Sequence, residues 1–221
     1  MEEIFERLTK EVLKGRIKDS FLAIYFTMAS IIQGVALGIL AFNTFGYIND
    51  PQYNNLWITF LPYTIISFFI IIIITYEFNW SLEVLRWSPR IWDTIVHFTL
   101  GFSEIAPMFF FTNPKIWWLL TSVFCFVGTL ALLNTFCHCK KDMFEKNETY
   151  RRVKNELLGS IIIAILAAFF CILVYSFSSN DVLYSNKGIL FLGFLFICGI
   201  ALLGKGEKFM NAMHRDFGLK R

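Results

Sequence analysis

Charged side chains are scarce in this 221-residue chain, where Asp, Glu, Lys and Arg make up 17% and hydrophobic residues 56%. So apolar a composition excludes intrinsic disorder, which requires low hydrophobicity and high net charge. The 26 phenylalanines, eight tyrosines and six tryptophans also exceed what a soluble core of this size can bury. The composition therefore predicts a membrane protein that has lipid as its main solvent.

Recognisable catalytic and metal-binding motifs are also missing. The sequence has no phosphate-binding glycine loop, serine hydrolase elbow, zinc-protease helix or dinucleotide fingerprint. The cysteines form no pairs of the kind that bind zinc: three lie inside apolar runs and two flank His138 (Cys125, Cys171, Cys198, Cys137 and Cys139). We therefore expect a protein that is not an enzyme and that holds no metal and no cofactor.

The first 18 residues lack the apolar core of a signal peptide and contain four glutamates. Their apolar residues instead recur at helical spacing on one stripe (Met1, Ile4, Phe5, Leu8 and Val12). This pattern predicts an N-terminal amphipathic helix over residues 1–20. Such a helix lies on the inner leaflet, or packs against its own protein or a neighbouring subunit.

Long uncharged runs predict the membrane spans, because a transmembrane helix needs about 20 apolar residues. Four runs contain no Asp, Glu, Lys or Arg (21–42, 56–76, 116–136 and 157–177). Two further segments complete the set: 188–203 is short, and 89–112 carries Asp93, His97 and Glu104 within its length. The predicted fold is thus an all-α polytopic membrane bundle, with six transmembrane helices over 21–204 and a basic tail over 205–221.

The distribution of Lys and Arg predicts the orientation, because cytoplasmic loops retain basic residues. Six spans with both termini inside place 18 of the 20 basic residues on the cytoplasmic side. The same count also allows a re-entrant hairpin around Thr112, Asn113 and Pro114 in place of the third and fourth spans. We favour full spans because the run 116–136 is longer than the half-helices of re-entrant loops.

The third predicted span carries a polar stripe. Asp93, His97 and Glu104 lie within a narrow arc of one helical face, and Arg90 begins the same stripe. Ionisable groups at membrane depth are costly and normally face protein or a water-filled cavity. The stripe therefore indicates either a permeation or proton pathway, or a structural polar network that bonds this span to another.

The first predicted span contains Gln33 beside the small-residue pair Gly34 and Gly38. Small residues four positions apart let two helices approach closely, and a glutamine can bond across such a contact. We expect these three residues to pack against another helix, within the chain or between subunits. Trp117 and Trp118, which open the fourth span, are typical of the aromatic belt at a membrane interface.

These features favour a homo-oligomeric ion channel or pore in a bacterial inner membrane, with cytoplasmic termini. The alternatives are a small-solute permease and a membrane effector or sensor operated by a cytoplasmic protein partner, as in bacterial stress response or phage defence. The bilayer and anionic lipid head groups are the expected partners of the basic loops. No direct contact with nucleic acid is expected.

Overall fold

The computed structural model describes residues 10–53, 57–84, 91–139, 141 and 147–216, and side chains are described for most of these. Every regular element in the described residues is helical, which confirms the all-α prediction. The described residues contain six long helices and three short helical turns. The long helices are α1 (Lys10–Asn49), α2 (Trp57–Val84), α3 (Ile91–Ile105), α4 (Pro114–His138), α5 (Asn147–Phe177) and α7 (Asn186–Asp216). The short turns are η1 (Pro51–Tyr53), η2 (Ala106–Phe109) and α6 (Asn180–Leu183).

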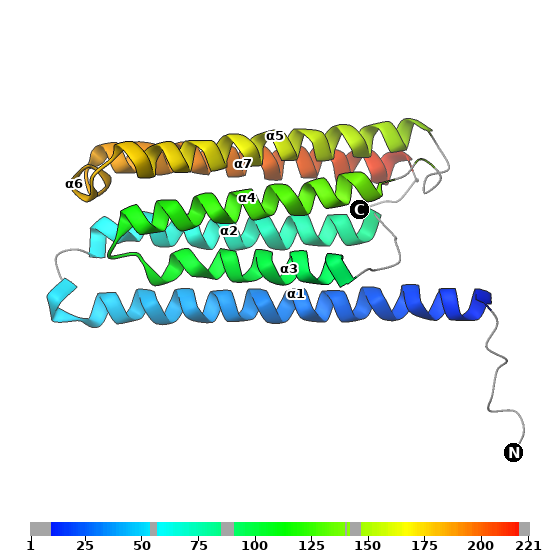
Figure 1. Cartoon of the computed structure of the whole chain (residues 1–221), viewed down its shortest axis with the longest axis horizontal. Coiled ribbons are helices and arrows are strands. Elements are labelled where there is room, and N and C mark those ends of the chain that lie inside the picture. Colours follow the sequence, from blue (N-terminus) through cyan, green and yellow to red (C-terminus); the bar gives the residue numbers. More distant parts are fainter. Residues whose placement is uncertain (1–9, 54–56, 85–90, 140, 142–146, 217–221) are drawn as a thin grey trace, which may run out of the picture.

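The long helices run side by side with their ends gathered at two poles (Figure 1). One pole holds α6 and the C-terminal ends of α1, η2 and α5. The other pole holds the C-terminal ends of α2, α4 and α7. Helix α4 has its most extensive contact with α5, α2 packs on α7 and α1, and α3 lies between α1 and α4. Helix α1 is at the edge of the bundle and extends beyond its neighbours at the N-terminal end (Figure 1).

Among the described residues, five helical segments are long and apolar enough to cross a membrane. They are Phe26–Asn49, Phe60–Glu77, Pro114–His138, Asn147–Phe177 and Asn186–Ala212. The remaining predicted span is the weakest, because α3 has only 15 residues before it tightens into η2. Together α3 and η2 measure roughly 30 Å, close to the thickness of a hydrocarbon layer. The count of six spans stays a prediction.

The turn between η2 and α4 lies at the pole that also holds α6. The Tyr184 hydroxyl donates to the carbonyl of Thr112 at 2.7 Å, and the amide of Lys115 donates to Asn180 Oδ1 at 3.2 Å. The α5–α7 connection and this turn therefore share one end of the bundle. This position favours a full crossing of the third and fourth spans over the re-entrant hairpin.

The helices are not interrupted at residues 20 and 204, where the sequence predicts boundaries between segments. Helix α1 is continuous from Lys10 to Asn49, and α7 continues through residue 204 to Asp216. Residues 1–9, which hold most of the predicted amphipathic stripe, lie outside the described residues. The amphipathic segment and the basic tail thus remain predictions as separate units.

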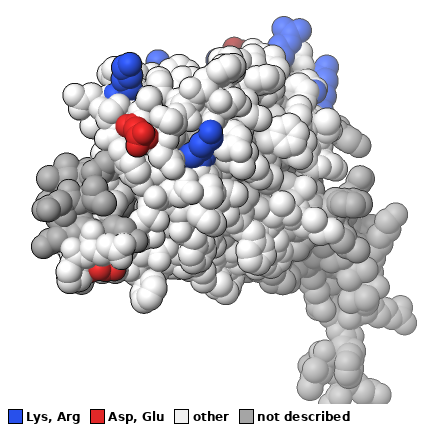
Figure 2. All heavy atoms as spheres, turned by 60° about the vertical axis from the view of Figure 1, so that its left-hand side comes forward, with Lys and Arg blue, Asp and Glu red and all other residues white. Residues whose placement is uncertain are grey.

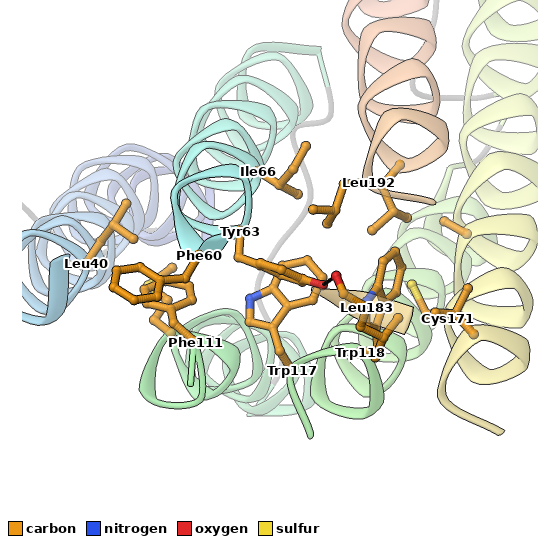
Figure 3. Packing of buried hydrophobic residues seen from close by; sticks show 14 of the residues in the cluster. Leu40, Phe60, Tyr63, Ile66, Phe111, Trp117, Trp118, Cys171, Leu183 and Leu192 are labelled. Carbon is orange, nitrogen blue, oxygen red and sulfur yellow. Dashed lines mark hydrogen bonds between the residues drawn. The ribbon is translucent and has the colours of Figure 1, made fainter. Parts of the chain in front are cut away.

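The largest buried cluster lies near the α6 pole and is built around two tryptophans (Figure 3). Helix α4 begins there because Asn113 accepts a hydrogen bond from the Ile116 amide and Pro114 occupies the first turn. This start places Trp117 and Trp118 inside the bundle, where both are 0% exposed. The prediction that they anchor the membrane interface was wrong, because neighbouring helices and α6 cover them.

The flanks of the bundle are strongly apolar. Large side chains such as Phe102, Phe169 and Phe177 are more than half exposed. Figure 2 shows charged side chains only as isolated spots on a mostly uncharged surface. Such a surface is expected of helices that face lipid.

Candidate functional site

A buried carboxyl group and a buried amide meet where α3 packs on α1. Gln33 Nε2 donates a hydrogen bond to Glu104 Oε2 at 3.1 Å. The Glu104 side chain is 2% exposed and that of Gln33 is 8% exposed. This contact joins two residues that the sequence analysis singled out for separate reasons.

The end of α3 fixes the position of Glu104. Pro107 follows three residues later, and the chain tightens there into η2, because proline cannot continue the hydrogen-bond ladder of an α-helix. The Asn43 amide group donates to the carbonyl of Met108 at 2.9 Å and ties η2 to α1. Glu104 lies roughly 20 Å along the helix from Ile91, deep within the apolar length of the bundle.

One oxygen of each partner is left over from this contact. Within the described part of the chain, Gln33 Oε1 and Glu104 Oε1 are buried and have no hydrogen-bond partner. A buried polar atom without a partner costs about 1–3 kcal/mol, so two of them on one hydrogen-bonded pair of side chains call for an explanation. The bonded and buried state of Glu104 favours the structural network over a water-filled pathway through a single chain.

The rest of the predicted stripe is described only in part. Asp93 and His97 lie on α3, but their side chains are outside the described residues, and Arg90 lies outside them entirely. The helical spacing still places Asp93, His97 and Glu104 on one face of α3. A role for the first three stripe residues stays a prediction.

The expectation that Gly34 and Gly38 pack closely within the chain was wrong. A Cβ atom built on either glycine meets nothing within 4 Å, and both residues are exposed. The close approach of α1 and α3 occurs instead at Gly101, where a Cβ atom would lie 2.5 Å from Ile32 Cγ2. The alternative use of Gly34 and Gly38, at a contact between subunits, stays a prediction.

The two glycines belong to a longer stripe on the outer face of α1. Its members are all exposed and recur at alternating spacings of four and three (Thr27, Ile31, Gly34, Gly38, Ala41 and Phe45). Such alternation is the heptad spacing of a helix that packs along its length against another helix. Gln33, Ala36 and Leu40 occupy the opposite face and are buried against the bundle.

The sequence analysis missed a polar contact between α5 and α7. Lys205 Nζ lies 3.3 Å from Glu156 Oε1, and both side chains are more than half buried. Gly159 leaves room for this lysine, because a Cβ atom there would overlap Lys205 Nζ. The only sequence signal was a lysine and a glutamate just outside the predicted spans, and such residues normally extend toward the interface.

The side chains of Cys137, His138 and Cys139 lie in three different surroundings and do not meet at one site. Cys137 is exposed, His138 Nδ1 contacts the Asn134 carbonyl at 2.8 Å, and Cys139 is buried in a second apolar cluster. Burial raises the pKa of the Cys139 thiol, and the positive charge of Lys154 opposes this shift. Among the described residues, no three His, Cys, Asp or Glu side chains are placed to hold a metal ion.

Comparisons of the chain with protein-family models, with curated proteins and with solved structures find no match.

Proposed function

We propose that this protein is a homo-oligomeric ion channel or pore whose copies meet through the outer face of α1. The pore lies between copies, around the axis of the ring, because Glu104 is buried within its own chain. We propose further that the protein resides in a bacterial inner membrane with both termini in the cytoplasm. The excess of Lys and Arg in the loops of one side supports this orientation.

The observation that carries the proposal is the group of small residues in the middle of the α1 face, between Ile31 and Phe45. Many exposed positions elsewhere on the bundle hold large side chains, including Phe102, Phe169 and Leu190. Gly34, Gly38 and Ala41 instead leave the α1 backbone uncovered. Small residues stabilise contacts between membrane helices, since they let two backbones approach and increase van der Waals packing.

The same face has the chemistry of a narrow polar pathway. Ser30 is exposed beside Gly34, and Thr27 lies one turn further toward the N-terminus. Hydroxyl groups at membrane depth can bond water or a partly hydrated ion. A ring larger than a dimer would place these residues around its axis.

A second candidate is a membrane subunit operated by a cytoplasmic protein partner. The observation in its favour is the N-terminal part of α1, which extends beyond the other helices (Figure 1). A protruding helix of this kind could dock on a partner and transmit its movement to the α1–α3 contact. This candidate predicts no flux from the purified protein alone.

Cysteine substitution along α1 tests the channel directly. In a Cys137→Ser background, Ser30→Cys and Ala41→Cys proteins are reconstituted into liposomes, and ion flux is measured before and after a hydrophilic thiol reagent. We expect a reduction of flux of roughly 10-fold, because the added group is held in the pathway. Phe169→Cys is the matched control, since this exposed residue lies on α5, away from the α1 face.

Flux that is equally sensitive at Phe169→Cys would contradict a pathway along α1. An absence of flux in every sample would instead favour the partner-operated subunit.

A further inference from the structure

The contact between Gln33 and Glu104 lacks a second hydrogen bond. The Gln33 amide group donates one hydrogen bond, to Glu104 Oε2. Two buried oxygens, Gln33 Oε1 and Glu104 Oε1, have no hydrogen-bond partner. An ionised carboxylate can only accept hydrogen bonds, so it cannot satisfy the amide oxygen. A protonated carboxyl group offers the missing O–H donor.

We infer that Glu104 and Gln33 form a proton-binding site, in which a proton on Glu104 Oε1 is donated to Gln33 Oε1. The acid and the amide are then joined by two antiparallel hydrogen bonds, and both leftover oxygens are used. The bound proton comes from water and returns to water on release. The inference stands independently of whether the copies form a channel.

Among the described residues, α1, η2 and α4 carry no cationic side chain within the apolar lengths that pack against α3. On α1, the stretch Phe26–Asn49 carries no Asp, Glu, Lys, Arg or His, and Tyr47 is its one ionisable side chain. On α4, Cys125 is the one ionisable group in the middle of the helix, and the others stand at its two ends (Lys115, Cys137 and His138). η2 carries no ionisable group.

Helix α3 itself carries the two remaining ionisable residues. His97 precedes Glu104 by seven residues, roughly 10 Å along the axis, and Asp93 lies one turn further away. A negative charge on Asp93 would disfavour a second negative charge on Glu104. A carboxylate without a counter-charge at this depth costs several kcal/mol, whereas a neutral acid bonded to an amide does not.

The site has a consequence for the contact between α1 and α3. Loss of the proton would remove one of the two hydrogen bonds and leave a charge in this contact, which would weaken it.

Infrared difference spectroscopy of the protein in lipid tests the inference at neutral pH. The wild-type spectrum minus that of Glu104→Gln should contain the carbonyl band of a protonated carboxylic acid. Glu104→Gln should also keep the thermal midpoint of the wild type, because two amides can form the same two bonds. Glu148→Gln is the matched control, since this glutamate is exposed and ion-paired with Arg152, and it should leave the acid band unchanged.

Gln33→Leu keeps the carboxyl group but removes its partner. The acid band should persist and move to higher frequency, because the carbonyl of Glu104 no longer accepts a hydrogen bond. A wild-type spectrum without a band that depends on Glu104 would overturn the inference, whatever the effect of the variants on folding. A band that Gln33→Leu does not shift would equally overturn the two-bond pair.

Discussion

Gly38→Leu is expected to leave the bundle folded and to weaken assembly, which in turn lowers ion flux. A Cβ atom on Gly38 meets nothing within 4 Å in the chain, so Gly38→Leu creates no internal clash. Between copies, the added side chain holds the α1 helices apart and removes their close packing. We expect the association constant to fall at least about 10-fold, which corresponds to roughly 1.4 kcal/mol. Sedimentation in detergent and flux in proteoliposomes measure the two effects.

Gly101→Leu is the matched control for this substitution. Gly101 lies where α3 approaches α1, and a Cβ atom there would meet Ile32 Cγ2 at 2.5 Å. A larger side chain must displace that contact, so we expect a loss of folding stability of about 1–3 kcal/mol. Gly38→Leu protein that assembles and conducts like the wild type would show that this face of α1 contacts only lipid.

Removal of the Trp117 side chain should cost the most folding stability of any substitution considered. The indole is completely buried and lies 5.0 Å from the ring of Tyr63 in an edge-on arrangement (Figure 3). It also donates to Ser67 Oγ at 3.4 Å. Trp117→Ala leaves a large cavity that the surrounding helices fill only in part. We therefore expect the free energy of unfolding to fall by about 3–5 kcal/mol. Unfolding by denaturant in mixed micelles, followed by circular dichroism, measures the change.

Phe177→Ala is the control for Trp117→Ala, because Phe177 is 85% exposed near the same pole of the bundle. An exposed side chain that faces lipid should change the free energy of unfolding by about 0.5 kcal/mol or less. Equal effects of the two substitutions would mean that Trp117 anchors the membrane interface and is not part of a core.

The helical fold could be predicted because long uncharged runs have few physical alternatives in lipid. Backbone groups there must bond within their own segment, so an apolar run such as 157–177 has to be helical. The third span was harder to delimit, because Pro107 ends α3 early and its ionisable residues weaken the apolar signal. The sequence also did not predict that α1 and α7 continue as helices past residues 20 and 204.

The candidate site could be predicted residue by residue but not as a pair. Glu104 was marked by its depth and Gln33 by its glycine neighbours, yet nothing in the sequence relates positions 71 residues apart. The role of glycine was equally hidden, because the close contact at Gly101 and the open face at Gly38 look alike in the sequence. The burial of Trp117 depends on how neighbouring helices cover the start of α4, and only the folded bundle supplies that information.

The copy number of the wild-type protein in lipid nanodiscs, determined by native mass spectrometry, tests the central claim most directly. The outer face of α1 can line a pathway only if several copies surround an axis. We predict a single closed assembly larger than a dimer. A protein that remains one chain per nanodisc at every protein-to-lipid ratio would contradict the proposed channel.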